Sequence, residues 1–148
     1  MSLTLLLAAL TAAAPAAASS VEIRTSVLAE TRVPAADGTT RVELKPAARV
    51  TPGDRIVFRV EYRNTGAQPA NGLVIANPVP AAMLYAGPAE GSPAPELSVD
   101  GRTFGPLAAL KVGTRPAVAA DVRVVRWHLT QPLAAGSHGQ VAFRAVIK

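Results

Sequence analysis

The chain has 148 residues, a mass of 15.2 kDa, a formal net charge of +5 and no cysteine. This length suits a single domain with one core, and the absence of cysteine excludes disulfides and thiolate metal sites. Thirteen prolines and eleven glycines interrupt the chain too often for long helices, and the Val-rich runs between them favour strands.

Residues 1–18 have the pattern of a secretory signal peptide. An apolar segment from Leu3 to Leu10 is followed by the small residues Ala16 to Ala18, which suit cleavage before Ser19. A membrane anchor is the alternative, but about 12–15 apolar residues are too few to span the roughly 30 Å hydrocarbon core of a bilayer. We therefore expect an exported protein, periplasmic or at the cell surface, with no transmembrane anchor after cleavage.

Residues 19–47 are expected to form an N-terminal extension of a strand and a hairpin. Val21 to Val27 alternates between apolar and polar residues, and Arg41 to Leu44 follows as a second alternating run. Between them, Asp37-Gly38 is typical of a tight turn. The main domain is then expected over residues 48–148.

The most regular strand pattern lies between Asp54 and Gly66. Apolar side chains fall on one parity and charged ones on the other, which is typical of a strand with one buried face. A slip of one residue would place three charges in the core, so this strand is expected to set the register of its neighbours. The predicted inward residues are Ile56, Phe58, Val60 and Tyr62, and the outward residues are Arg55, Arg59, Glu61 and Arg63.

Shorter runs follow. Leu73 to Ile75 and Met83 to Tyr85 are predicted strands, and Asp100-Gly101, between 97–99 and 102–104, is the clearest hairpin signal of the chain. Residues 107–116 are interpreted as a loop, with one helical turn as an alternative.

Two strands are predicted near the C-terminus. In 121–130 the apolar parity changes between Val124 and Val125, so we expect a bulge that lets Trp127 point inward. From Val141 to Lys148 the alternation is regular. Eight or nine short strands at intervals of about 8–12 residues, without a convincing helix, predict an all-β antiparallel sandwich. Its predicted core is Ile56, Phe58, Val60, Tyr62, Trp127, Leu129 and Phe143.

Residues 48–148 resemble a conserved-repeat family called domain of unknown function eleven. The resemblance lies in Pro52-Gly53-Asp54, the strand that ends in Asn64-Thr65-Gly66, Pro78-Val79-Pro80, and the closing segment from Val125 to Ala145. It implies an immunoglobulin-like β-sandwich with Greek-key connections and about seven to nine strands. It also implies a structural or adhesive module of exported bacterial or archaeal proteins. This chain departs from the family pattern in carrying Asn77 where an Asp is usual, and in holding one copy.

The histidines and serines lack the neighbours that a metal or catalytic site needs. His128 and His138 have no further metal ligands at a recognisable spacing, and Ser92, Ser98 and Ser137 have no base beside them in a known motif. A crosslink between Lys45 or Lys111 and Asn64 or Asn77 is a minor alternative. A basic interaction face for an anionic envelope polymer is a further hypothesis, and a solvated, edge-protecting face is its alternative. That face comprises Arg55, Arg59, Arg63, Arg123 and Arg126.

These patterns predict a non-enzymatic, exported, single-domain module of the cell envelope with a structural or protein-interaction role and no cofactor. Its partner would be a protein or an anionic envelope polymer, with no nucleic acid. One alternative is a subunit of a surface fibre or assembly that adds a strand to its neighbour, with 19–34 as the donor and self-association as a consequence. A small carbohydrate-binding module is a weaker alternative, because the few aromatics lie on core parity.

Overall fold

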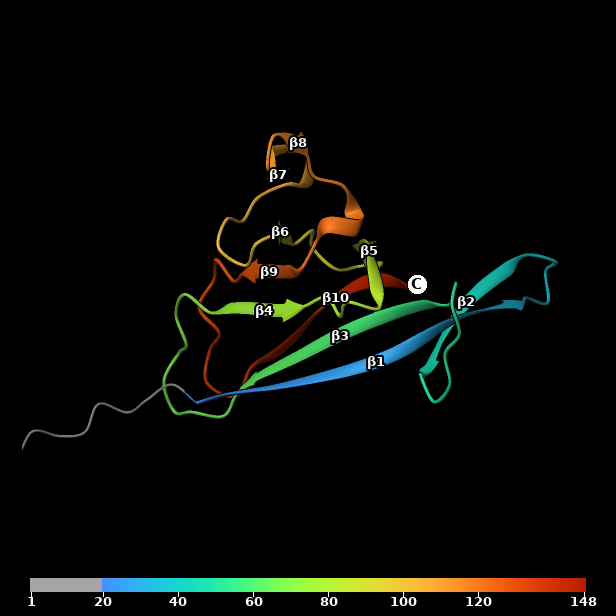
Figure 1. Cartoon of the computed structure of the whole chain (residues 1–148). Coiled ribbons are helices and arrows are strands. Elements are labelled where there is room, and N and C mark those ends of the chain that lie inside the picture. Colours follow the sequence, from blue (N-terminus) through green and yellow to red (C-terminus); the bar gives the residue numbers. More distant parts are fainter. Residues whose placement is uncertain (1–19) are drawn as a thin grey trace, which may run out of the picture.

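The computed structural model describes residues 20–148, so the predicted signal peptide lies outside the described residues (Figure 1). The described part is all-β, with ten strands in antiparallel sheets and two short 3-10 turns. No helix in this part is long and apolar enough to cross a membrane. The strands are β1 (Val21–Pro34), β2 (Thr40–Pro46), β3 (Arg55–Asn64), β4 (Val74–Pro78), β5 (Met83–Pro88), β6 (Glu96–Ser98), β7 (Lys111–Val112), β8 (Arg115–Pro116), β9 (Val124–His128) and β10 (His138–Ile147).

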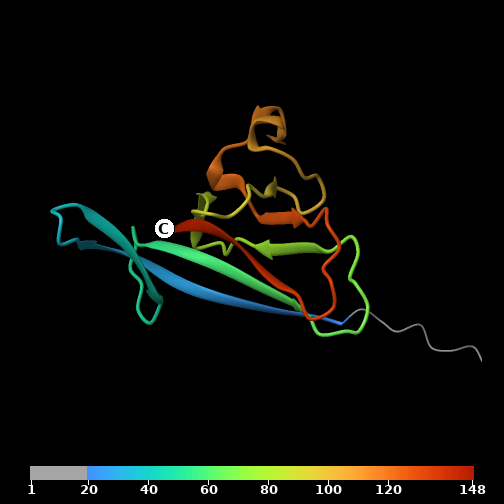
Figure 2. The same cartoon turned by 180° about the vertical axis from the view of Figure 1, so that it is seen from behind.

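Two sheets face each other across a common core. The five-stranded sheet has the order β2-β1-β3-β10-β5, and the three-stranded sheet has the order β4-β9-β6. Figures 1 and 2 show the two layers from opposite sides, with the small β7–β8 hairpin beyond the three-stranded sheet. The chain changes sheets between β3 and β4, between β4 and β5, between β5 and β6, and between β9 and β10.

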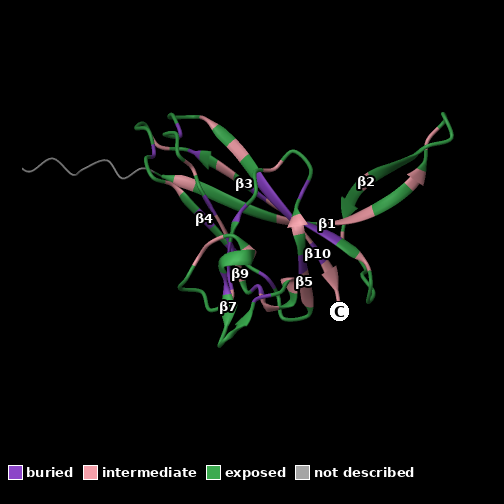
Figure 3. Ribbon diagram, turned by 90° about the horizontal axis from the view of Figure 1, so that it is seen from above, coloured by how far each residue is buried: buried purple, intermediate pink, exposed green. Residues whose placement is uncertain are grey.

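The alternation of β3 places it at the centre of the core, as predicted. Phe58 stacks on Phe143 of β10 with ring centroids 4.9 Å apart, and Trp127 of β9 packs on the same ring at 6.3 Å. Figure 3 shows that buried residues gather on β3, β4 and β9. The predicted core residues Ile56, Phe58, Val60, Trp127 and Phe143 are buried, and Tyr62 and Leu129 are partly buried against the same cluster.

Val57 is buried as well, although it lies on the outward parity of β3. It forms a small second cluster with Ala89 and Ala142, and Leu28 packs against this cluster. The segment after β5 covers this part of the sheet, because Ala89 N–H donates to the carbonyl of Ala142 and Ser92 Oγ accepts from Ala142 N–H. The outer face of the five-stranded sheet is therefore partly covered.

The expected N-terminal hairpin is present, and its first strand is longer than predicted. β1 pairs with β2 from Leu28 to Pro34 and with β3 from Val21 to Ala29. Asp37 closes the turn, since its carboxylate accepts from the N–H and the hydroxyl of Thr39. Beyond residue 30 the hairpin projects from the body of the protein, and most of β2 is exposed (Figures 1 and 3).

The hairpin predicted at Asp100-Gly101 does not form a regular ladder. β6 ends at Ser98, and the returning arm makes only an isolated bridge between Leu97 and Gly105. The carboxylate of Asp100 accepts from the backbone N–H groups of Arg102 and Thr103, which lowers the pKa of Asp100 to about 2. These donors are held in an Asx turn, so they do not extend the strand.

The bulge predicted at 124–125 is also absent. β9 begins only at Val124 and pairs without a shift with both β4 and β6. Val122 is buried from the end of a 3-10 turn over Ala119–Asp121, before the strand starts. The change of parity therefore reflects the entry into the strand. Residues 107–116 contain a 3-10 turn (Leu107–Ala109) and the β7–β8 hairpin, within the segment predicted as a loop with a possible helical turn.

Candidate binding surface

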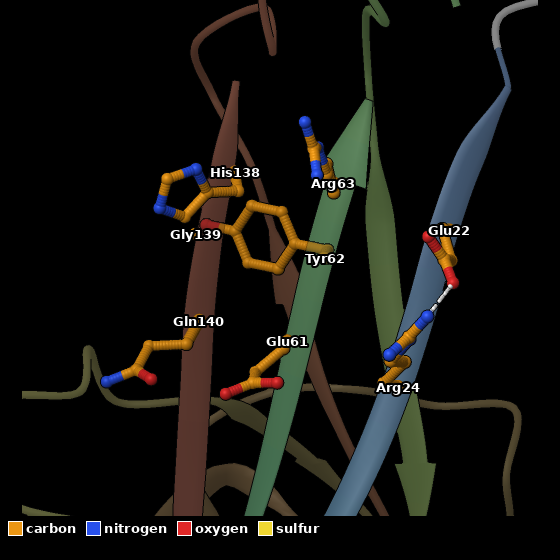
Figure 4. A pocket seen from close by; sticks show the side chains of 8 residues that line it. All are labelled: Glu22, Arg24, Glu61, Tyr62, Arg63, His138, Gly139 and Gln140. Atoms are coloured by element: carbon orange, nitrogen blue, oxygen red, sulfur yellow. Dashed lines mark hydrogen bonds and ion pairs between the residues drawn. The ribbon is translucent and has the colours of Figure 1, made fainter. Parts of the chain in front are cut away.

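A shallow hollow of about 610 Å³ lies where β1, β3 and β10 run side by side at one end of the five-stranded sheet (Figure 4). Charged and polar side chains from all three strands surround it. We call it the charged hollow, and its lining residues are Glu22, Arg24, Glu61, Tyr62, Arg63, His138, Gly139 and Gln140.

The strand register arranges these side chains in two rows across the sheet. Residues directly opposite each other in an antiparallel pair point to the same face. One row therefore runs Glu22, Arg63, His138, and the next runs Arg24, Glu61, Gln140. Opposite charges face each other between β1 and β3 in both rows, so these four charges balance.

One ion pair in the hollow is closed along a single strand. Arg24 donates to Glu22 Oε1 from Nε at 2.9 Å and from Nη2 at 2.7 Å, and Figure 4 shows this contact. The hydrogen bond with Glu22 raises the pKa of Arg24, and Glu61 contributes in the same direction. Both side chains are exposed, so the pair adds little to folding stability and leaves both groups accessible to a partner.

Tyr62 also lines the hollow, although its side chain has the inward parity of β3, and its ring lies across Gly139 of β10 (Figure 4). Tyr62 and Gly139 are directly opposite in the register. A methyl group on Gly139 would come within 2.6 Å of Tyr62 Cζ, so the ring occupies the space that a side chain would need. Tyr62 and Gln140 also border a second hollow of about 600 Å³, beside β9 and residues 130–133.

The structure divides the five arginines of the predicted interaction face. Arg55, Arg59 and Arg63 lie on the outer face of β3, as the alternation predicted. Arg126 projects from the outer face of the three-stranded sheet, on the opposite side of the core, and exposed Arg123 precedes the same strand. The two groups of arginines do not form one surface.

Arg126 is already engaged by neighbouring side chains. It donates to Glu96 Oε2 at 2.9 Å from Nε and at 2.7 Å from Nη2, and its guanidinium lies 3.7 Å from the centre of the Phe104 ring. His128 Nε2 is 3.4 Å from the same Glu96 oxygen, which places this cluster at the rim of the second hollow.

Asn64 has a structural role that the sequence pattern did not reveal. Its side chain is fully buried, and Nδ2 donates to the carbonyls of Gln68 at 2.7 Å and Leu133 at 2.9 Å, while Oδ1 accepts from Gly66 N–H. It thereby ties together the loops that follow β3 and β9. The Asn-Thr-Gly motif was the available signal, because Asn after a strand often bonds local backbone.

Lys45 is exposed and pairs with Glu43, whereas the Asn64 side chain bonds to the carbonyls of Gln68 and Leu133. Among the described residues, the structure therefore shows no contact between Lys45 and Asn64 that would support the minor crosslink alternative. In the same part of the chain, no group of three or more His, Cys, Asp or Glu residues could hold a metal ion. The charged hollow offers paired charges, an amide and an imidazole, which are groups that can bind a partner.

Comparisons of the chain with protein-family models, with curated proteins and with solved structures found no match. The resemblance to the conserved-repeat family stays a prediction.

Proposed function

We propose that this protein is an exported, non-enzymatic module of the cell envelope that acts by binding through the outer face of its five-stranded sheet. The charged hollow carries this proposal, because it gathers charged groups from β1 and β3 and polar groups from β10 on one face of a hydrogen-bonded sheet. The same proposal includes an immunoglobulin-like sandwich with Greek-key connections. Two facing antiparallel sheets and four changes of sheet along the chain support that assignment.

Arg59 decides what kind of partner suits this face. The four charges of the hollow balance, whereas Arg59 faces the small residues Ser26 and Ala142 in the next row and adds a positive charge without an acid opposite. This excess favours an anionic envelope polymer or an acidic protein surface. Attraction of this kind weakens as salt screens the charges.

Binding to purified teichoic acid and lipopolysaccharide tests the proposal. We expect retention of the protein by at least one polymer, with a clear loss in Arg59→Glu and Arg63→Glu and in high salt. The matched control is Arg102→Glu, an exposed arginine in the 100–104 turn that makes the same change in charge. Equal retention of all three variants would exclude this face, and no retention at all would exclude the polymer.

Export has its own test. The intact mass of the protein recovered after expression in a bacterial host should correspond to a chain that begins at Ser19. A protein that keeps residues 1–18 and stays inside the cell would contradict export, whatever the outcome of the polymer experiment.

The two alternatives differ in support. A carbohydrate-binding module usually needs an exposed aromatic platform, and Trp127, Phe58 and Phe143 are buried. The assembly subunit has a specific observation in its favour, because part of β1 has an open edge. However, Val21–Pro34, the greater part of the predicted donor, is itself a strand of the sheet.

A further inference from the structure

The first half of β1 has one open backbone edge. β3 pairs with β1 from Val21 to Ala29, whereas β2 pairs with it only from Leu28 onward. Among residues 20–148, none pairs with the stretch from Val21 to Ser26 on the side away from β3. We call the stretch from Val21 to Ser26 the open edge.

Two hydrogen bonds show which backbone groups point to the open edge. Thr65 N–H donates to the carbonyl of Ser20 at 2.8 Å on the β3 side, and Ala47 N–H donates to the carbonyl of Val27 at 3.1 Å on the other side. Successive residues of an antiparallel strand point to alternate edges. Val21, Ile23 and Thr25 therefore direct their N–H and C=O groups to the open edge.

Other strand edges carry features that discourage pairing. β4 ends at Pro78, β5 ends at Pro88, β6 is three residues long, and β2 ends at Pro46. Natural sheets protect their edges in these ways. The open edge contains no proline or glycine, and Ile23 at its centre is 49% exposed.

We propose that two copies of this chain pair antiparallel through their open edges, with Ile23 of each copy opposite Ile23 of the other. Val21 then lies opposite Thr25 of the partner subunit, and their outward N–H and C=O groups can form the ladder. The two five-stranded sheets become one continuous sheet about a two-fold axis, and the contact is the same patch on both copies.

Charge selects this register. It places Glu22 of each copy opposite Arg24 of the partner subunit on the outer face, which gives two opposite-charge pairs. A shift of two residues in one direction sets Glu22 against Glu22 of the partner subunit, and the reverse shift sets Arg24 against Arg24 of the partner subunit. Like charges directly opposite are destabilising, and a shift of one residue would bring inner side chains to the outer face.

This inference goes beyond the proposed function, because it requires neither export nor a polymer. Its test is sedimentation equilibrium of the purified protein over a concentration series, with Glu22→Arg, Arg24→Glu and an equal mixture of the two. We expect a reversible monomer–dimer equilibrium for the wild type. The dissociation constant of the dimer should rise about tenfold or more in each single variant, since two pairs change from opposite to like charge.

The mixture of the two variants is the decisive sample. Each variant carries like charges at positions 22 and 24, so two copies of the same variant repel each other. In the mixture, a copy of one variant faces a copy of the other with opposite charges in both pairs. Heterodimers should therefore restore association to near the wild-type level. Glu90→Arg and Arg102→Glu, both exposed and outside β1 and β3, make the same changes in net charge and should leave the dimer intact.

Thr25→Pro tests the backbone contribution independently. It removes an N–H that points to the open edge and no hydrogen bond to β3, so we expect a folded monomer, with the fold checked by thermal unfolding. A wild type that is monomeric at every concentration would overturn the proposal. So would a dimer that survives both charge swaps or the Thr25→Pro change.

Discussion

At the scale of single residues, Asn64 shows how one buried amide can organise two loops. Both of its N–H donors and its oxygen are used, by the carbonyls of Gln68 and Leu133 and by Gly66 N–H. Its backbone adds two more contacts, to Ser137 O and from Gly136 N–H. Such a site is stable only while every member keeps its partner.

Asn64→Ala should therefore lower the free energy of unfolding by about 2–4 kcal/mol, because each buried group left without a partner costs about 1–3 kcal/mol. Chemical denaturation measures this difference. Asn71→Ala, an exposed asparagine of the same loop, should change stability by less than about 0.5 kcal/mol. Equal effects of the two changes would show that the buried bonds are not the cause.

At this scale the sequence predicts which side chains share a face of a strand, and the fold decides what covers that face. Alternation identified the buried face of β3, because period two fixes which side chains share a side. It did not identify Val57 as buried, since the covering segment near Ala89 comes from a distant part of the chain. Nor could parity show that Arg59 and Arg126 lie on opposite sides of the core, because that depends on which strands join which sheet.

At the scale of elements, one side chain limited the pairing of a predicted hairpin. The long runs of β3 and β10 formed as predicted. At Asp100-Gly101 the chain turns back as predicted but pairs only through the bridge between Leu97 and Gly105, because the Asp100 carboxylate accepts from two backbone N–H groups of the returning arm. The charged hollow could be predicted in part: the alternation placed Arg63 and Glu61 outward. The register that brings Glu22, Arg24 and His138 beside them depends on pairing between segments far apart in sequence.

The pairing of β3 with β10 at the hollow depends on the absence of a side chain at Gly139. Gly139→Ala should destabilise the protein by about 1–3 kcal/mol, because the added methyl group displaces the ring of Tyr62. In a Tyr62→Ala background the same change should have little effect. A double-mutant cycle measured by thermal unfolding separates the two terms, and additive losses would contradict the steric explanation.

At the scale of the whole molecule, the shared core joins the two sheets into one cooperative unit. Phe143 of the five-stranded sheet contacts both Phe58 of its own sheet and Trp127 of the other. A substitution in one sheet should therefore shift the unfolding transition of both sheets by the same amount.

Phe143→Ala should lower the free energy of unfolding by about 3–5 kcal/mol, because it opens a cavity between the sheets. Trp127 is the only tryptophan, so its fluorescence reports on the three-stranded sheet, while circular dichroism reports on all strands. The two transitions should coincide in the wild type and shift together in the variant. Separate transitions would mean that the sheets unfold independently.

The projecting end of the β1–β2 hairpin has a practical consequence. Its turn around Asp37 and Gly38 is exposed and lies away from the shared core (Figure 1). Chain tips of this kind accept insertions and are the preferred sites of proteolytic cleavage. A peptide tag or a fluorescent protein inserted after Asp37 would therefore be displayed at a distance from both hollows, and a protease should cleave this turn before it cleaves the strands of the shared core.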